Sequence, residues 1–146
     1  MNERTIFNSA VSAIALNALY KTSQDSGRAA PHERLVGLEH YQPERQLVCG
    51  ARLIPYQGHW LLRNLCTLPH CRGQRLASQL LQQLQQLHDC QPLYTLPLPE
   101  LDAFYLSNGF QPLSDNDLPA ALLPVLRQSR RRHKGIQAMV SCQRLR

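Results

Sequence analysis

A turn with the composition of an anion-binding site joins two regular segments between residues 66 and 78. It reads Cys-Thr-Leu-Pro-His-Cys-Arg-Gly-Gln-Arg-Leu-Ala-Ser, and Pro69 and Gly73 mark it as a turn. An apolar segment precedes it, and a segment with helical periodicity follows it. The first N–H groups of a helix lack internal partners, and the helix dipole favours negative charge there. The turn is therefore a candidate pyrophosphate site, and an ordinary strand-to-helix connection is the alternative.

Two further side chains have types that suit chemistry. Tyr105 follows Phe104 and precedes the pair Gly109-Phe110. From the residues alone, the simplest interpretation is a tyrosine packed in the core. Arg63 interrupts an apolar segment, where it would hold a substrate carboxylate or phosphate, or form a buried ion pair.

Regular segments that could position these residues alternate along the chain. Apolar patterning with turn residues at the ends predicts strands, and apolar residues repeating every three or four positions predict helices. The predicted strands are 4–8, 34–41, 46–55, 59–68, 93–98 and 136–142. The predicted helices are 10–20, 74–87, 100–108 and 117–130, the last broken near Pro124. Strand 59–68 is apolar on both faces, which predicts a central position in a sheet.

Length and composition narrow the class of protein. The 146 residues suit one domain, 1–146. No apolar stretch approaches the length of a membrane span, so we expect no membrane partner. The five cysteines are scattered without a CxxC pair, which favours reduced thiols, no metal site and a cytoplasmic location. Strands joined by short turns, followed by strand–helix–strand, predict an α/β (α+β) fold with a mixed sheet and helices on its faces.

The net charge of +6 favours anionic partners. The densest basic cluster is Arg127, Arg130, Arg131, Arg132, His133 and Lys134. No aromatic residue interleaves with this cluster, which favours a solvated helix end over a nucleic-acid surface. We therefore do not expect nucleic acid as the partner.

Two motifs together resemble the GCN5-related N-acetyltransferase (GNAT) superfamily. Arg72-Gly73-Gln74-Arg75-Leu76-Ala77 resembles the motif that begins the long helix of the family, and Thr67-Leu68-Pro69 takes the place of the preceding aliphatic-x-Pro. Tyr105, four residues before Gly109-Phe110, resembles a second family feature. The resemblance implies a mostly antiparallel sheet of six to seven strands. It also implies helices on both faces and a cleft where strands 59–68 and 93–98 splay apart.

The resemblance also implies an activity and a set of site residues. The expected function is direct transfer of an acetyl group from acetyl-CoA to a primary amine of a small molecule, an amino acid or a peptide. Tyr105 would protonate the leaving thiolate. The expected cofactor-binding residues are Leu65, Cys66, Thr67, Arg72, Gly73, Gln74, Arg75, Leu76, Ala77 and Ser78. A homodimer through the C-terminal strand is an analogy with the family.

The chain departs from the family pattern at two points. Arg75 stands where the family has its first motif glycine, which lets a phosphate approach the backbone closely. Strand 59–68 has no carboxylate to serve as general base. The alternative function is therefore a catalytically silent GNAT-like domain that binds CoA or a partner protein. Candidate replacements for the base are Glu39, which could also contact substrate, and His40, His70, Glu100 and Asp102.

Overall fold

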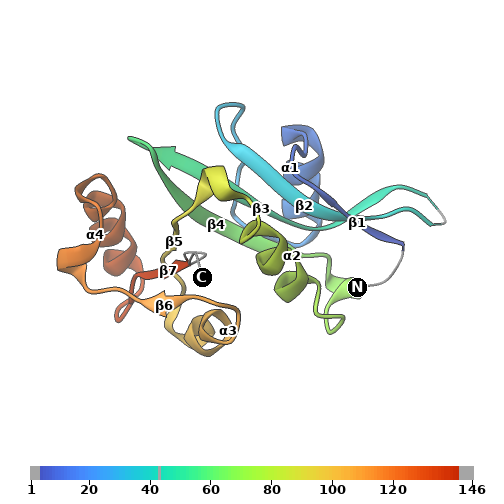
Figure 1. The fold of residues 1–146 in the computed structure, drawn as a ribbon. Helices are drawn as coiled ribbons and strands as arrows, with labels where there is room; N and C mark the ends of the chain where they lie inside the picture. The colour runs from blue at the N-terminus through green and yellow to red at the C-terminus, as the bar shows by residue number, and fades with distance from the viewer. Residues whose placement is uncertain (1–3, 43, 142–146) are drawn as a thin grey trace. The chain divides into compact units, whose positions relative to one another are not determined.

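The computed structural model describes residues 4–42 and 44–141. Within them the strands form a seven-stranded sheet in the order β1-β2-β3-β4-β5-β7-β6 (Figure 1). The strands are β1 (Thr5–Asn8), β2 (Arg34–His40), β3 (Gln46–Tyr56), β4 (His59–Thr67), β5 (Leu93–Thr95), β6 (Gln111–Pro112) and β7 (Met139–Ser141). The pairs β1–β2, β2–β3, β5–β7 and β6–β7 are antiparallel, and β4 pairs with β5 in parallel. The predicted mixed, mostly antiparallel sheet is confirmed.

The helices of the described residues are α1 (Ala13–Thr22), α2 (Leu76–Leu84), α3 (Asp102–Leu106) and α4 (Leu123–Arg132). The side chain of Ser12 begins α1 by accepting a hydrogen bond from the amide of Ala15 at 3.1 Å. One apolar stripe of α2 is buried, as the sequence predicts for a helix packed on a sheet. That stripe consists of Leu76, Leu80, Leu81 and Leu84.

The chain divides into two compact units. The first unit comprises Met1–Ile54 and Arg63–Leu84, and the second comprises Pro55–Leu62 and Gln85–Arg146. The sequence expectation of a single domain over residues 1–146 stays a prediction.

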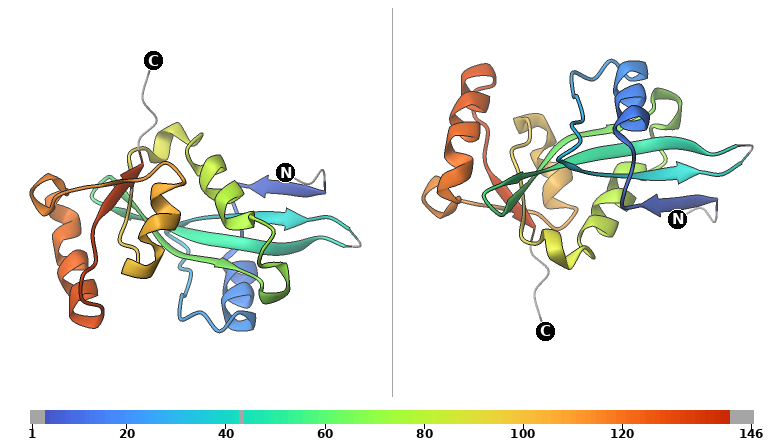
Figure 2. Two further views of the ribbon diagram at one scale, coloured as in Figure 1. Left: turned by 90° about the horizontal axis from the view of Figure 1, so that it is seen from below. Right: turned by 90° about the horizontal axis from the view of Figure 1, so that it is seen from above.

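In the first unit, α1 and α2 lie on opposite faces of the strands (Figure 2). Gly50 of β3 allows α1 to approach, because a Cβ atom at this position would lie 2.6 Å from Cδ1 of Leu16. The aliphatic side chains Leu38, Leu53 and Leu80 are fully buried in this unit. These contacts fix the strands from which the following turn and α2 emerge.

In the second unit, α4 and the segment before it share one apolar cluster with β5 and the residues that lead into β7. Its buried members are Leu61, Tyr94, Leu96, Leu118, Leu122, Leu126, Ile136 and Ala138. The turn between β3 and β4 also belongs to this unit. Gln57 and Gly58 have φ values of 51° and 85°, the positive pair that a two-residue hairpin of type I′ requires.

Several element bounds differ from the sequence predictions. β5 ends at Thr95, because Pro97 cannot donate to a ladder. The predicted helix from residue 117 is instead two 3₁₀ turns followed by α4, with Pro124 in its first turn, where a missing N–H is tolerated. Strand β6 was not predicted. The end of predicted strand 136–142 at Cys142 lies outside the described residues.

Candidate functional site

β4 extends well beyond its pairing with β5. The parallel ladder joins Trp60, Leu61 and Leu62 to Leu93, Tyr94 and Thr95. β4 then continues through Thr67, and its described residues after Leu62 have no ladder partner in β5. The backbone groups of this final stretch are of the kind that could pair with an extended ligand.

Asn64 bends this final stretch of β4. Its φ is 54°, a left-handed conformation that asparagine tolerates better than most residues. The Tyr20 hydroxyl donates to the Asn64 carbonyl oxygen at 2.7 Å. Burial raises the pKa of Tyr20, so the phenol keeps its proton for this bond. The side chain of Asn64 joins the polar network described below.

The turn between β4 and α2 presents a row of backbone N–H groups. A 3₁₀ turn at Pro69–Cys71 follows β4, and Gly73 and Arg75 then have φ values of 83° and 60°. In the described part of the chain, no oxygen accepts a hydrogen bond from the amides of residues 73–78. The first ladder bond of α2 runs from the Gln79 amide to the Arg75 carbonyl at 3.0 Å. Left-handed residues in such turns form concave nests of N–H groups that bind anions.

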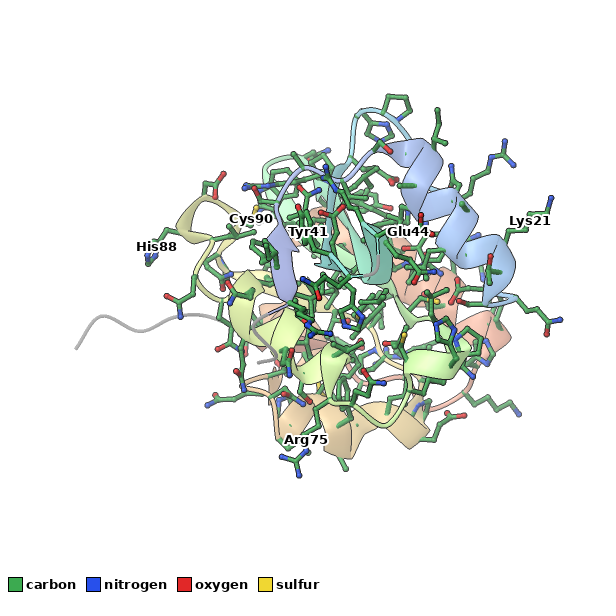
Figure 3. All side chains as sticks on the ribbon, turned by 90° about the vertical axis from the view of Figure 1, so that its right-hand side faces the viewer. Lys21, Tyr41, Glu44, Arg75, His88 and Cys90 are labelled. Carbon is green, nitrogen blue, oxygen red and sulfur yellow. The ribbon has the colours of Figure 1, made fainter. Side chains whose placement is uncertain are left out.

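This turn is open to solvent. Residues 72–75 are exposed, and a Cβ atom built on Gly73 would have no heavy atom within 4 Å. The Arg75 side chain extends away from the ribbon (Figure 3) and makes no hydrogen bond or ion pair with the described residues. The arginine at the family glycine position therefore keeps the glycine-like backbone conformation and does not tie its guanidinium to the protein.

A polar network connects β4 to the loop that follows α1. The Asn64 amide nitrogen donates to Asp25 Oδ1 at 3.0 Å, and Arg52 Nη1 donates to Asn64 Oδ1 at 2.9 Å. Arg52 also forms a two-bond ion pair with Glu33, with distances of 2.8 and 2.6 Å. Glu33 is almost fully buried, with a side-chain exposure of 3%. Burial alone would raise the pKa of Glu33, but hydrogen bonds from Arg52 and from the Ala30 amide lower it below its usual range.

The cysteines beside the turn are buried thiols. Burial raises the pKa of Cys49 to about 12, and it raises the pKa values of Cys66 and Cys71 as well. The Thr67 hydroxyl donates to Cys49 Sγ at 3.4 Å. These groups are neutral at physiological pH and are therefore poor nucleophiles and metal ligands. Among the described residues, no group of three or more His, Cys, Asp or Glu side chains could hold a metal ion.

Tyr105 belongs to the second unit, on α3. Its side chain is 6% exposed, and its ring makes edge-to-face contacts with Phe104 and Phe110 at centroid distances of 5.2 and 5.3 Å. Gly109, with a φ of 90°, ends the segment in the predicted left-handed conformation. Gln85 Nε2 donates to the Asn108 carbonyl at 2.6 Å and holds this end of α3.

Two other predicted contact residues lie elsewhere in the first unit. Glu39 of β2 is 7% exposed, and Oε1 accepts a hydrogen bond from Arg45 Nε at 3.1 Å. Its other oxygen, Oε2, accepts from the side-chain Nδ2 of Asn8 at 3.4 Å. Glu39 is therefore engaged in contacts within the strands near β1. Arg63 of β4 is partly buried.

The basic cluster near the end of α4 contains one arginine that is bonded within the protein and five exposed residues. Arg130 donates to both carboxylate oxygens of Asp115 and to the Ile136 carbonyl. The other five basic residues are exposed, as expected for a solvated helix end: Arg127, Arg131, Arg132, His133 and Lys134. No helix within residues 4–42 and 44–141 has the length and apolar character needed to cross a bilayer.

Sequence reasoning missed the network of Asp25, Glu33, Arg52 and Asn64. Residues 21–31 read only as a polar loop, and Arg52 and Asn64 read as ordinary strand positions. One signal was present, because asparagine is depleted from strand interiors and enriched in left-handed conformations. The partners of such a residue come from distant parts of the sequence, so its spacing does not predict them.

Comparison with known proteins agrees with this geometry. Residues 33–112, more than half of the chain, match the family described as acetyltransferase (GNAT) domain. No curated protein sequence matches the chain.

Solved structures share the fold at low sequence identity. N-acetylglutamate synthase from Neisseria gonorrhoeae, complexed with coenzyme A and N-acetyl-glutamate, has a TM-score of 0.72 at 14% identity. The match covers 99% of this chain but 36% of that one, so this chain spans about a third of the synthase. Rv2747 from Mycobacterium tuberculosis, in complex with CoA and NLQ, has a TM-score of 0.71 at 11% identity, covering 95% and 99% of the two chains.

A third similar structure is the ribosomal-protein-S18-alanine N-acetyltransferase from Escherichia coli. Its TM-score is 0.62 at 15% identity, with 97% of this chain and 96% of that chain covered. The matched family, the shared fold and the amide row at the start of α2 lead to one conclusion. The chain belongs to the GNAT acetyltransferase family.

Proposed function

We propose that this protein transfers an acetyl group from acetyl-CoA directly to the nitrogen of a primary amine. The observation that carries the proposal is the row of unpartnered amides at residues 73–78, beside left-handed Gly73 and Arg75. A helix start with exposed N–H groups suits a diphosphate. The family match supports an acyl-CoA as the ligand that brings this diphosphate.

The cofactor contacts follow from the backbone of the first unit. The amides of residues 73–78 bind the diphosphate of the donor, and Arg72 and Arg75 have exposed guanidinium groups that can reach its phosphates. The backbone of Leu65, Cys66 and Thr67, beyond the β5 ladder, pairs with the pantetheine arm as an added strand would. These roles use main-chain groups, so they need no particular side chain at most positions.

The chemical step forms one bond and breaks one. The amine nitrogen attacks the thioester carbonyl carbon, and a backbone N–H at the end of β4 stabilises the oxygen that becomes negative. The C–S bond then breaks, the nitrogen loses one proton to solvent or to a base so that the neutral amide leaves, and the sulfur takes a proton from the hydroxyl of Tyr105. The rigid aromatic contacts of Tyr105 with Phe104 and Phe110 would hold the phenol in one orientation.

Thiol release tests this proposal. The purified chain is incubated with acetyl-CoA and a panel of primary amines that includes free amino acids, short peptides with free N-termini and polyamines. Amine-dependent release of CoA, with the acetylated amine identified by mass spectrometry, is the expected result. Acetyl-CoA that binds tightly without turnover for any amine would instead support the silent CoA-binding domain, which the arginine at position 75 favours.

A further inference from the structure

Asp25 presents one carboxylate oxygen that the protein holds and one that it leaves open. Oδ1 accepts hydrogen bonds from the Gly27 amide at 2.7 Å and from Asn64 Nδ2 at 3.0 Å. Among the described residues, no donor reaches Oδ2. The side chain is partly buried, so the open oxygen is held in place without being sealed from ligands.

The orientation of Asp25 is fixed by a chain of bonds. Arg52 donates to Asn64 Oδ1, so the NH₂ group of the Asn64 amide must face Asp25. The Arg52 guanidinium is itself anchored by its two bonds to Glu33. In addition, the Asp25 amide donates to the Tyr20 carbonyl at 2.9 Å, which ties the loop to the end of α1. Gly27 packs closely against the Asn64 side chain, because a Cβ atom at position 27 would lie 2.6 Å from Asn64 Cγ.

Among the charged and titratable groups around Asp25, none other is suited to accept a proton from a substrate amine. Burial raises the pKa values of Tyr20 and Cys66, and the nearby Asp25 carboxylate adds to both increases. Both groups therefore stay neutral at physiological pH. The Arg52 charge is paired with Glu33. The positive charge of Arg72, in the turn after β4, partly offsets the increase in the pKa of Cys66. Asp25 is thus a carboxylate close enough to Cys66 to raise the pKa of its thiol, and Cys66 is one of the β4 residues proposed to hold the acyl donor.

We infer that Asp25 binds the amino group of the acetyl acceptor through Oδ2 and accepts its proton during transfer. This inference rests on the proposed acetyltransferase function and supplies the base that β4 lacks. An ammonium group donates to Oδ2 on arrival. The ammonium first passes this proton to Oδ2, which frees the nitrogen lone pair to attack the thioester. As the N–C bond forms, the nitrogen becomes acidic and loses its second proton to water, while the thiolate leaves with the proton of Tyr105. After the product leaves, Asp25 returns its proton to solvent and the Tyr105 phenolate takes one from solvent.

The variant D25N tests this role with little change of shape. An asparagine keeps an oxygen for the bonds from Gly27 and Asn64, and it replaces only the open oxygen with an NH₂ group. The control E44Q neutralises an exposed carboxylate in the turn between β2 and β3 (Figure 3). Three quantities are measured for each variant: the thermal midpoint, the Kd of acetyl-CoA, and kcat/KM for the best amine from pH 6 to pH 10.

A lost general base typically costs about 10²-fold or more in rate. D25N is expected to lose about that much kcat/KM at pH 7, with a Kd for acetyl-CoA within about twofold of the wild type. The loss should shrink toward pH 10, where the amine arrives without its extra proton. E44Q should match the wild type throughout, and D25E should keep the wild-type shape of the pH profile at a lower kcat.

Other results separate the two proposals. Equal kcat/KM values for D25N and the wild type would overturn the role of Asp25 and leave the acetyltransferase proposal standing. A loss that is constant across the pH range would also overturn the base role. If D25N does not fold, a D25E profile that loses the wild-type pH dependence would overturn it. A wild-type chain that releases no CoA with any amine would overturn the proposed function, and this inference with it.

Discussion

Gly73 and Arg75 adopt left-handed backbone conformations two residues apart, with φ values of 83° and 60°, in the turn that leads into α2. Glycine adopts such a φ at little steric cost, whereas for arginine the Cβ atom crowds the backbone. The chain thus keeps the backbone shape of a glycine-rich anion site while placing a bulky side chain at one of its two left-handed positions. The stability of the turn and its binding of phosphate can therefore be tested separately.

Replacing Arg75 by glycine should stabilise the protein. A left-handed residue other than glycine costs about 1–2 kcal/mol, and the added freedom of glycine in the unfolded chain returns about 0.5–1 kcal/mol of that. We expect R75G to raise the free energy of unfolding by about 0.5–1 kcal/mol in urea titrations. R75A removes the same charge and keeps the strain, so it should not show this gain.

The same pair of variants shows what binds the phosphates. If the backbone amides carry the diphosphate, R75G and R75A should bind acetyl-CoA with similar Kd values in calorimetry. A large and equal weakening in both variants would mean instead that the guanidinium is the main phosphate contact.

Gly73 and Gly58 form a matched pair for a second test. Their φ values are 83° and 85°, and a Cβ atom at either position would meet no heavy atom within 4 Å. G73A and G58A should each lose about 1–2 kcal/mol of stability from backbone strain. Only G73A should weaken acetyl-CoA binding, measured by calorimetry, because Gly58 lies in the β3–β4 hairpin. Equal Kd values for both variants would argue against a ligand at the α2 turn.

Much of this turn was predictable from the sequence, because its conformation depends on residues that are close together in the chain. Pro69, Gly73 and the leucine stripe of the following helix predict a strand-to-helix turn by rules that need only neighbouring residues. The left-handed conformation of Arg75 was not predictable from its own type, which disfavours it. Only the resemblance to a family with glycine at this position pointed to a special backbone there.

Removing the hydroxyl of Tyr105 should slow the chemical step. Y105F keeps the ring contacts with Phe104 and Phe110, so we expect a stable protein that binds acetyl-CoA as the wild type does. Without the proton donor for the thiolate, kcat should fall by about 10²-fold or more. Y56F, which alters a tyrosine packed on the apolar cluster of the second unit, serves as the control. Unchanged turnover in Y105F would remove the acid role.

The buried Arg52–Glu33 pair should make the free energy of unfolding decrease at acidic pH. The folded state lowers the pKa of Glu33, so its stabilisation is present above the pKa of an unfolded glutamate, about 4.3. It is lost as the pH falls through the lower pKa of the folded state. E33Q should remove this part of the pH dependence. At pH 7 it should also cost about 1.5–3 kcal/mol, because a charged hydrogen-bond partner of Arg52 is lost.

Chemical denaturation between pH 3 and pH 7 measures this effect. D115N is the matched control, because Arg130 also donates two hydrogen bonds to the Asp115 carboxylate, at an exposed site. Exposed pairs contribute little, so D115N should change stability much less than E33Q does. Equal effects of the two variants would show that burial of the Glu33 pair adds nothing.

This network also marks the limit of what the sequence predicts. Glu33, Arg52 and Asn64 are far apart in the chain, and nothing in their spacing pairs them. Glu39 was a reasonable candidate base because it lies on a strand, yet its two oxygens are engaged by Arg45 and Asn8. Asp25 lies in a loop without periodicity, so the sequence did not single it out as a candidate base. The proposed role depends on the bend of β4 at Asn64, which brings a donor to the Asp25 carboxylate.

The central claim is that main-chain N–H groups at residues 73–78 hold the diphosphate of acetyl-CoA. Amide hydrogen exchange, followed by mass spectrometry, measures these groups directly, because without a ligand they have no partner to protect them. Saturating acetyl-CoA should slow exchange in the peptide that covers residues 73–78. Acetyl-pantetheine, which lacks the diphosphate, should leave its exchange unchanged. Acetyl-CoA that binds without slowing exchange in this peptide, or acetyl-pantetheine that slows it equally, would contradict the claim.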